Sequence, residues 1–185
     1  MKKFVKSRGH GFTIIEVMIV LAIAALILLV VFLAVPNLQR SQKNNARKSD
    51  ASRMAAAVVD FTSTNSTGSL PSSFNDCTTL VQATTSLSQF TFTTPCVAAN
   101  AAATMAALSM SSNNLYIVAN ASGGTIPAIP AGTTGVMILA DQAQCPASIV
   151  PGTTAFAAGS NPKQAALLYN LQTGTGFNWG CVNPQ

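Results

Sequence analysis

Apolar and polar residues are distributed unevenly along this chain of 185 residues. Val17 to Val35 form an uninterrupted apolar run, long enough for a helix of roughly 28 Å, which is close to the hydrocarbon thickness of a bilayer. A cleaved signal peptide has a shorter apolar core followed by a small-residue cleavage site. Here Pro36 follows instead, where we expect a kink or the membrane boundary. The pattern predicts a transmembrane helix that stays in the protein.

Beyond Pro36 the apolar residues recur at three- and four-residue steps, which is typical of an amphipathic helix. We expect one helix from about Phe12 to Thr64, ended by the glycine and proline of residues 65–71. Its polar positions predict a solvated face; lipid headgroups or a neighbouring subunit are the alternative partners. The apolar stripe comprises Leu38, Ala46, Ala51, Met54, Ala55, Val58, Val59 and Phe61, and the polar cluster Arg40, Lys43, Asn44, Arg47, Lys48, Asp50 and Arg53.

The C-terminal part has segments with the composition of β-strands. Three or four antiparallel strands laid over the amphipathic half of the helix predict an α+β head with a single core. The alanine-rich stretch Val97 to Leu108, in a region with few periodic signals, predicts a short helix. Strands are predicted at residues 114–119, 135–140, 165–171 and 177–182, the last two as a hairpin with a glycine-containing loop.

The net charge of +5 applies to the whole chain, including its basic N-terminal residues, and not to the part that follows them. Hydrophobic residues make up 49% and charged residues only 8%, and four of the ten basic side chains lie within the first ten residues. Without residues 1–11, six basic side chains face five acidic ones. A nucleic-acid-binding domain spreads basic residues over a folded face, so no direct nucleic-acid partner is predicted.

Four cysteines follow the apolar run: Cys77, Cys96, Cys145 and Cys181. An even number, without a CxxC pair or a nearby histidine, favours disulfides over a metal site. Four free buried thiols, the alternative, would suit a cytosolic protein. Disulfides predict that this part of the chain is exported, and four cysteines allow three pairings.

Glu16 is a carboxylate just inside the apolar helix, which costs several kcal/mol unless it is paired. It either stays protonated near the interface or meets a cation. No residue from Phe12 to Val35 is basic, so the cation must come from outside this helix. The free α-amino group of a cut N-terminus would serve.

The segment Gly11-Phe12-Thr13-Ile14-Ile15-Glu16, with a Lys/Arg leader before it and the apolar run after it, resembles the signal sequence of type IV prepilins. The resemblance implies cleavage between Gly11 and Phe12 by a prepilin peptidase and N-methylation of Phe12. It also implies that Glu16 pairs with the N-terminal amine of a neighbouring subunit during assembly. We expect Thr13 to support this pair by hydrogen bonding.

The resemblance also implies an organisation for the chain. It comprises a leader (1–11), a transmembrane helix (12–35), an amphipathic helix (36–65) and a disulfide-stapled globular head (66–185). Because basic residues flank the apolar run on both sides, charge alone leaves the orientation open. The family and the cysteines place the leader in the cytoplasm. For the disulfides we prefer Cys77–Cys96 and Cys145–Cys181, the second of which resembles the bridged C-terminal region of many pilins.

No catalytic set is visible, and no enzyme activity, metal or cofactor is predicted. The only histidine is His10 in the leader, and Asp76 and Asp141 are isolated. No acidic residue follows Asp141, which disfavours the calcium-binding loop of some pseudopilins.

The predicted function is that of a structural subunit of a type IV pilus. It is held in the cytoplasmic membrane lipid before assembly and lies in an extracellular filament afterwards. Its partners are the prepilin peptidase, copies of itself and other pilins, and an assembly platform with its ATPase. The alternatives are a pseudopilin of a type II secretion or DNA-uptake system, or a membrane-tethered adhesin that does not polymerise. The sequence does not separate adhesion from twitching motility.

Overall fold

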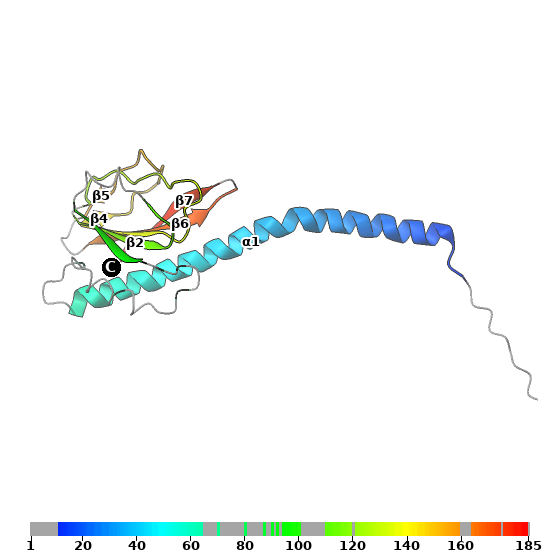
Figure 1. Ribbon diagram of the computed structural model, residues 1–185, viewed down its shortest axis with the longest axis horizontal. Coiled ribbons are helices and arrows are strands. Elements are labelled where there is room, and N and C mark those ends of the chain that lie inside the picture. The colour runs from blue at the N-terminus through cyan, green and yellow to red at the C-terminus, as the bar shows by residue number, and fades with distance from the viewer. Residues whose placement is uncertain are drawn as a thin grey trace, which may run out of the picture. The chain divides into compact units, whose positions relative to one another are not determined.

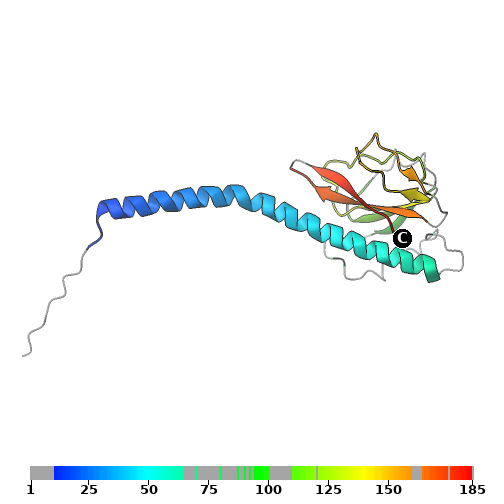
Figure 2. The ribbon, with the colours of Figure 1, turned by 180° about the vertical axis from the view of Figure 1, so that it is seen from behind.

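Over the residues that it describes, the computed structural model has one long helix followed by seven strands. Figures 1 and 2 show their arrangement from opposite sides. The elements are α1 (Ile14–Thr64), β1 (Thr94–Asn100), β2 (Asn114–Ala119), β3 (Met137–Asp141), β4 (Ala143–Gln144), β5 (Ala157–Ala158), β6 (Ala165–Gln172) and β7 (Phe177–Val182). The structure describes residues 11–64, 70, 80, 87, 90, 92, 94–100, 110–119, 121–159, 164–174 and 176–184, with only the backbone of 94–100 and 119.

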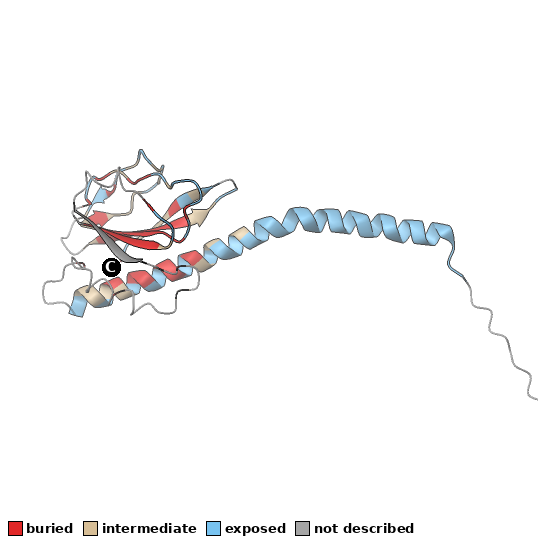
Figure 3. Ribbon diagram, viewed as in Figure 1, coloured by how far each residue is buried: buried red, intermediate tan, exposed pale blue. Residues whose placement is uncertain are grey.

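Residues 1–39 and 40–185 form two separate units. In the first, every residue from Gly11 to Gln39 is exposed. The apolar part of α1 is long and apolar enough to cross a membrane, with a mean hydropathy of 3.4 over its best window and none of that window buried. Figure 3 shows this half of α1 exposed on every side, whereas the half that belongs to the second unit has a buried face. Pro36 lies within α1.

The main sheet of the second unit is mixed. Its strand order is β1-β2-β3-β6-β7. The pairs β3–β6 and β6–β7 are antiparallel, as predicted, but β1–β2 and β2–β3 are parallel. Parallel neighbours need a connection of about a dozen residues or more, and residues 120–136 provide one between β2 and β3. Four of the five strands of this sheet were therefore predicted, all of them as antiparallel, whereas β1 was not predicted as a strand.

The sheet has a core on each face, and the prediction of a single core was wrong. Leu115 and Ile117 of β2 point to one face, and Tyr116 and Val118 to the other, as the two-residue period of a strand requires. The first face packs on the buried stripe of α1, which includes Ala51, Met54, Ala55 and Val58. The second face is covered by residues that come before and after β3 in the chain, including Ala121, Ile126, Ala143 and Phe156, and β4 and β5 lie on this side of the sheet (Figures 1 and 2).

Most predicted elements have counterparts in the structure. Strands β2, β6 and β7 lie where the strand composition placed them, and β3 begins at Met137 instead of residue 135. The helix predicted at Val97 to Leu108 was wrong over its first part, because residues up to Asn100 belong to β1, while residues 101–108 lie outside the described residues. Pairing of β1 with β2 overrides the helix propensity of its alanines.

Candidate assembly site at the start of the helix

Thr13 and Glu16 form a reciprocal hydrogen-bonded cap at the first turn of α1. The backbone N–H and the hydroxyl of Thr13 both donate to Oε2 of Glu16 at 2.8 Å. The backbone N–H of Glu16 donates to Oγ1 of Thr13 at 3.3 Å. This is a capping box, which satisfies backbone donors that a helix leaves unpaired at its N-terminus. This capping role was not predicted from the sequence, although the T-x-x-E spacing before an apolar run is its signal.

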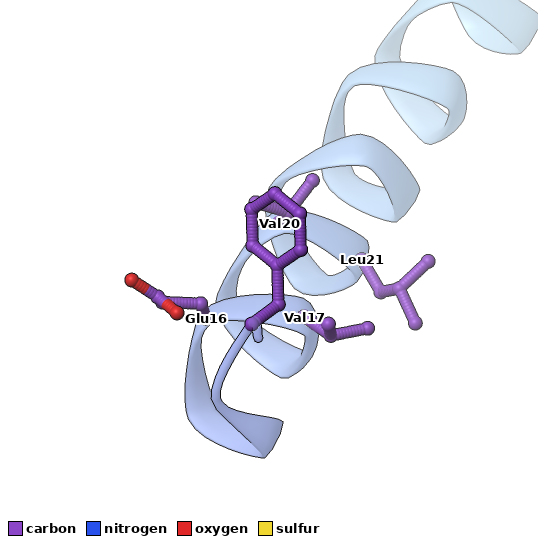
Figure 4. Close-up of a pocket in the computed structure, with 5 residues that line it drawn as sticks. Glu16, Val17, Val20 and Leu21 are labelled. Atoms are coloured by element: carbon purple, nitrogen blue, oxygen red, sulfur yellow. The ribbon is translucent and has the colours of Figure 1, made fainter. Parts of the chain in front are cut away.

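The capping box fixes the position of the Glu16 carboxylate. Phe12, Glu16, Val17, Val20 and Leu21 line a shallow groove on the helix surface that is almost entirely apolar. Figure 4 shows Glu16 projecting away from the side of the helix that carries Val17 and Leu21. The side chain is exposed in the single chain. The helix therefore presents one oriented carboxylate beside an apolar surface, which suits an electrostatic contact with another molecule.

Gly11 and Phe12 precede the helix and are accessible. Phe12 is 90% exposed, and a Cβ added at Gly11 would meet no atom within 4 Å. The fold of this chain therefore does not require glycine at position 11. A requirement for glycine there would come from a molecule that acts on this segment, as expected of a peptidase.

Asn44 joins α1 to the end of β6 within the second unit. Its Nδ2 donates to the carbonyl oxygen of Gln172, and its Oδ1 accepts the backbone N–H of Gln172, both at 2.8 Å. One side chain thus satisfies both backbone groups of a strand residue, as a neighbouring strand would. This contact fixes the helix relative to the β6–β7 hairpin.

Arg47 and Asp50 are buried, at 7% and 1% exposure, so the prediction of a solvated face was wrong for these two residues. They lie on the same stripe as Ala51 and Met54, because positions three and four apart share a helix face. Because both side chains are charged, they were assigned to the solvated face of the helix. Lys43, Lys48 and Arg53 are exposed, in agreement with the prediction.

The guanidinium group of Arg47 is only partly satisfied. Its Nη1 donates to the carbonyl oxygen of Asn170 at 3.4 Å, and its central carbon lies 5.4 Å from the centroid of the Phe177 ring, within cation–π range. Its Nε is buried and has no hydrogen-bond partner among the residues that the structure describes. Burial lowers the pKa of Arg47, although its ordinary value is so high that the group stays charged at neutral pH.

Replacing Arg47 should separate its packing from its charge. We expect Arg47→Met to leave the free energy of unfolding unchanged or to raise it by about 1 kcal/mol, because the stem is kept and a poorly satisfied buried charge is removed. Arg47→Ala, which also loses the stem, should lower it by about 2 kcal/mol. Urea unfolding followed by Trp179 fluorescence measures both. A Met variant as unstable as the Ala variant would contradict this account.

Cys145 and Cys181 form a disulfide with their Cα atoms 5.8 Å apart. The backbone N–H of Cys145 also donates to Oδ1 of Asn183 at 2.8 Å, so the same two segments are tied twice. Cys77 and the side chain of Cys96 lie outside the described residues, and their pairing stays a prediction.

Trp179, Asp141 and Asp76 are the other residues that the sequence singled out. Trp179 is a core aromatic as predicted, 4% exposed, with its Nε1 donating to the carbonyl oxygen of Pro127 at 2.7 Å. Asp141 is half-buried; burial raises its pKa, and a hydrogen bond from the N–H of Gln142 opposes that shift. Within the described residues no three His, Cys, Asp or Glu side chains gather as metal ligands. Asp76 lies outside them.

Comparison with known families assigns the N-terminal segment. Residues 6–32 match the family described as the prokaryotic N-terminal methylation motif, which is the prepilin-type cleavage and methylation signal. No curated protein and no solved structure matches the chain. The motif, the membrane-length helix and the sheet packed on its second half define a membrane-anchored prepilin-type protein with a pilin-like α+β fold.

Residues 6–32 thus carry the prepilin-type cleavage and methylation signal that type IV pilins and pseudopilins share, as the N-terminal motif predicted. The motif implies processing by a prepilin peptidase and assembly with other pilins.

Proposed function

We propose that this protein is a filament subunit of a type IV pilus. In this proposal the prepilin peptidase cuts between Gly11 and Phe12, the new N-terminus at Phe12 is methylated, and the subunit waits in the cytoplasmic membrane. Subunits then polymerise through their N-terminal helices into an extracellular filament, driven by an assembly platform and its ATPase.

The observation that carries the proposal is the complete exposure of Gly11–Gln39 in the single chain. Lipid covers such a surface before assembly, and like helices cover it afterwards. Transfer from lipid to a helix bundle exchanges one apolar environment for another, so apolar burial alone gives little bias. A charged contact that forms only in the correct register supplies the missing specificity, and Glu16 is the one acidic residue in this part of the chain.

The capping box supports this role for Glu16. Because Thr13 holds one carboxylate oxygen at 2.8 Å, the charge is directed before a partner arrives. Ordering the side chain in advance reduces the entropy that assembly would otherwise lose. The expected partner is the α-amino group of Phe12 in a neighbouring subunit.

A pseudopilin of a type II secretion or DNA-uptake system remains the second candidate, since it would share the leader, the helix and Glu16. A membrane-tethered adhesin that does not polymerise is the third. The head has few charged residues, since Asp141 and Lys163 are the only Asp, Glu, Lys or Arg from position 110 to position 184, and this is compatible with each of them.

The N-terminus of the purified protein tests the proposal. Mass spectrometry of the protein from its native membrane should show a chain that begins with N-methylated Phe12, lighter than the full sequence by residues 1–11. A chain that still begins with Met1 would refute the processing step. Filaments sheared from cells should contain the same processed chain as their main component. If processed protein stays in the membrane while sheared filaments lack it, the pilus function is wrong, and the pseudopilin and the tethered adhesin are the candidates left.

A further inference from the structure

The helix segment just beyond the apolar run is rich in positive charge and poor in negative charge. Four cations lie between Arg40 and Lys48, and no acidic residue occurs from position 17 to position 49. Arg47 is buried against the sheet, but Arg40 is only half-buried and Lys43 and Lys48 are exposed. The first acidic residue that follows, Asp50, is 1% exposed and faces the head.

The position of two of these cations along α1 matches the headgroup layer of a membrane. By helix rise, Arg40 follows Val35 by about 7 Å, Lys43 by about 12 Å and Lys48 by about 20 Å. A headgroup layer is roughly 5–8 Å thick. Helical side chains lean toward the N-terminus of their helix, so the long stems of Arg40 and Lys43 extend back toward the end of the apolar run. Lys48 is too far along the helix to reach.

A second copy of the chain is a poor partner for this charge. The whole sequence has five acidic residues, of which Asp50 is buried and Asp141 half-buried. Anionic phospholipids, by contrast, offer phosphates at the level where the apolar run ends. Cations on the exported flank of a membrane helix also oppose the usual charge bias across membranes, whereas uncharged polar residues such as the nearby Gln42 and Asn45 would solvate the helix without that cost.

We propose that Arg40 and Lys43 bind the phosphates of anionic phospholipids at the membrane surface where the subunit's head begins. The contact holds the unassembled subunit at a fixed depth and is released when the helix leaves the bilayer. It rests on the membrane insertion of the proposed function, and it applies to a pilin and a pseudopilin alike.

Partition of the full chain between two kinds of vesicle isolates this contact. One population is phosphatidylcholine, and the other is phosphatidylcholine mixed with phosphatidylglycerol. The apolar part of α1 inserts into both kinds of vesicle, so its contribution cancels in the ratio of the two partition coefficients. The cations of the leader are present in every variant and do not affect the comparison between variants. Each Lys or Arg near an anionic surface contributes about 1 kcal/mol. We therefore expect Arg40→Gln/Lys43→Gln to reduce the preference for anionic vesicles roughly tenfold to thirtyfold.

Lys48→Gln is the matched control, since it removes one exposed cation farther along the same helix. It should change the ratio by less than about twofold at moderate salt, where the screening length is about 10 Å. Trp179 fluorescence verifies that each variant is folded.

Three results distinguish the ways in which the inference can fail. If the wild-type chain binds neither kind of vesicle, membrane insertion and the proposed function are both wrong. If it binds both kinds but the double variant has the same partition ratio as the wild type, only the lipid-binding inference is wrong. If Lys48→Gln lowers the ratio as much as either single change at Arg40 or Lys43, the attraction is a diffuse charge effect and the headgroup-level contact is refuted.

Discussion

Glu16→Gln is expected to leave leader removal intact and to reduce filament formation at least about tenfold. In the proposed assembly the carboxylate meets the α-ammonium group of Phe12 of a neighbouring subunit inside an apolar bundle. Removing one partner of such a pair leaves an unpaired buried charge, which costs about 3–5 kcal/mol. That penalty recurs at each subunit added, so growth should stop. Immunoblots of sheared filaments and of membranes, compared for the same cells, measure the two pools.

Glutamine is chosen because it separates the charge from the helix cap. A capping box accepts Gln as well as Glu at its last position, so Glu16→Gln should preserve the start of α1. Thr13→Val is the complementary change: it removes the hydroxyl that bonds Oε2 of Glu16 and keeps the charge. The loss of a cap costs about 1 kcal/mol, and filaments should still form. If Thr13→Val abolishes filaments while Glu16→Gln permits them, the role of Glu16 is capping and the pairing hypothesis is wrong.

The N-terminal site could be predicted from the sequence because its signals are local. A carboxylate in an apolar helix needs a partner whatever the rest of the fold does, and a leader before Gly11 requires no tertiary information. The capping box between Thr13 and Glu16 was equally local and could have been recognised from its spacing. The proposed partner of Glu16 could not be located in the single chain, because in the proposed assembly it belongs to another molecule.

The helix and the hairpin could also be predicted, whereas residues whose environment depends on distant segments could not. The extent of α1 follows from its periodicity up to Thr64, and β6 and β7 from their composition. The alanines of β1 favour a helix by themselves and form a strand only because β2 lies beside them. The burial of Arg47 could not be predicted, because its position and its residue type gave opposite indications. Its place on the stripe with Ala51 and Met54 indicated burial, whereas its charge indicated exposure to solvent.

These differences affect how the head is attached to the helix. Ala51, Met54 and Val58 pack on the sheet through apolar contacts, whereas Asn44 and Arg47 bind backbone groups of β6. Apolar packing tolerates small displacements along the helix axis, but the two 2.8 Å bonds of Asn44 to Gln172 fit one register only. Apolar contacts alone would hold the helix against the sheet without fixing its position along the helix axis. The buried polar residues therefore specify where on α1 the hairpin docks.

Removal of the Cys145–Cys181 bridge is expected to give the largest loss of stability of any change considered for the head. The bridge closes a loop of 36 residues in sequence separation, for which loop-closure entropy predicts about 3–4 kcal/mol. The double variant Cys145→Ser/Cys181→Ser should therefore unfold at clearly lower urea concentration than the wild type. Trp179, the single tryptophan, lies two residues before Cys181 and is buried, so its fluorescence reports this transition.

Asn183 provides the matched control for this change. Its Oδ1 accepts the N–H of Cys145 and ties the same two segments without a covalent bond. Asn183→Ala should lower the free energy of unfolding by about 1 kcal/mol, the usual contribution of one hydrogen bond. If the disulfide constrains mainly the unfolded chain, the double Ser variant should lose several times more than Asn183→Ala while the folded-state fluorescence of Trp179 stays the same. Equal losses from the two variants would show that the bridge adds no more than a local contact between the segments that it joins.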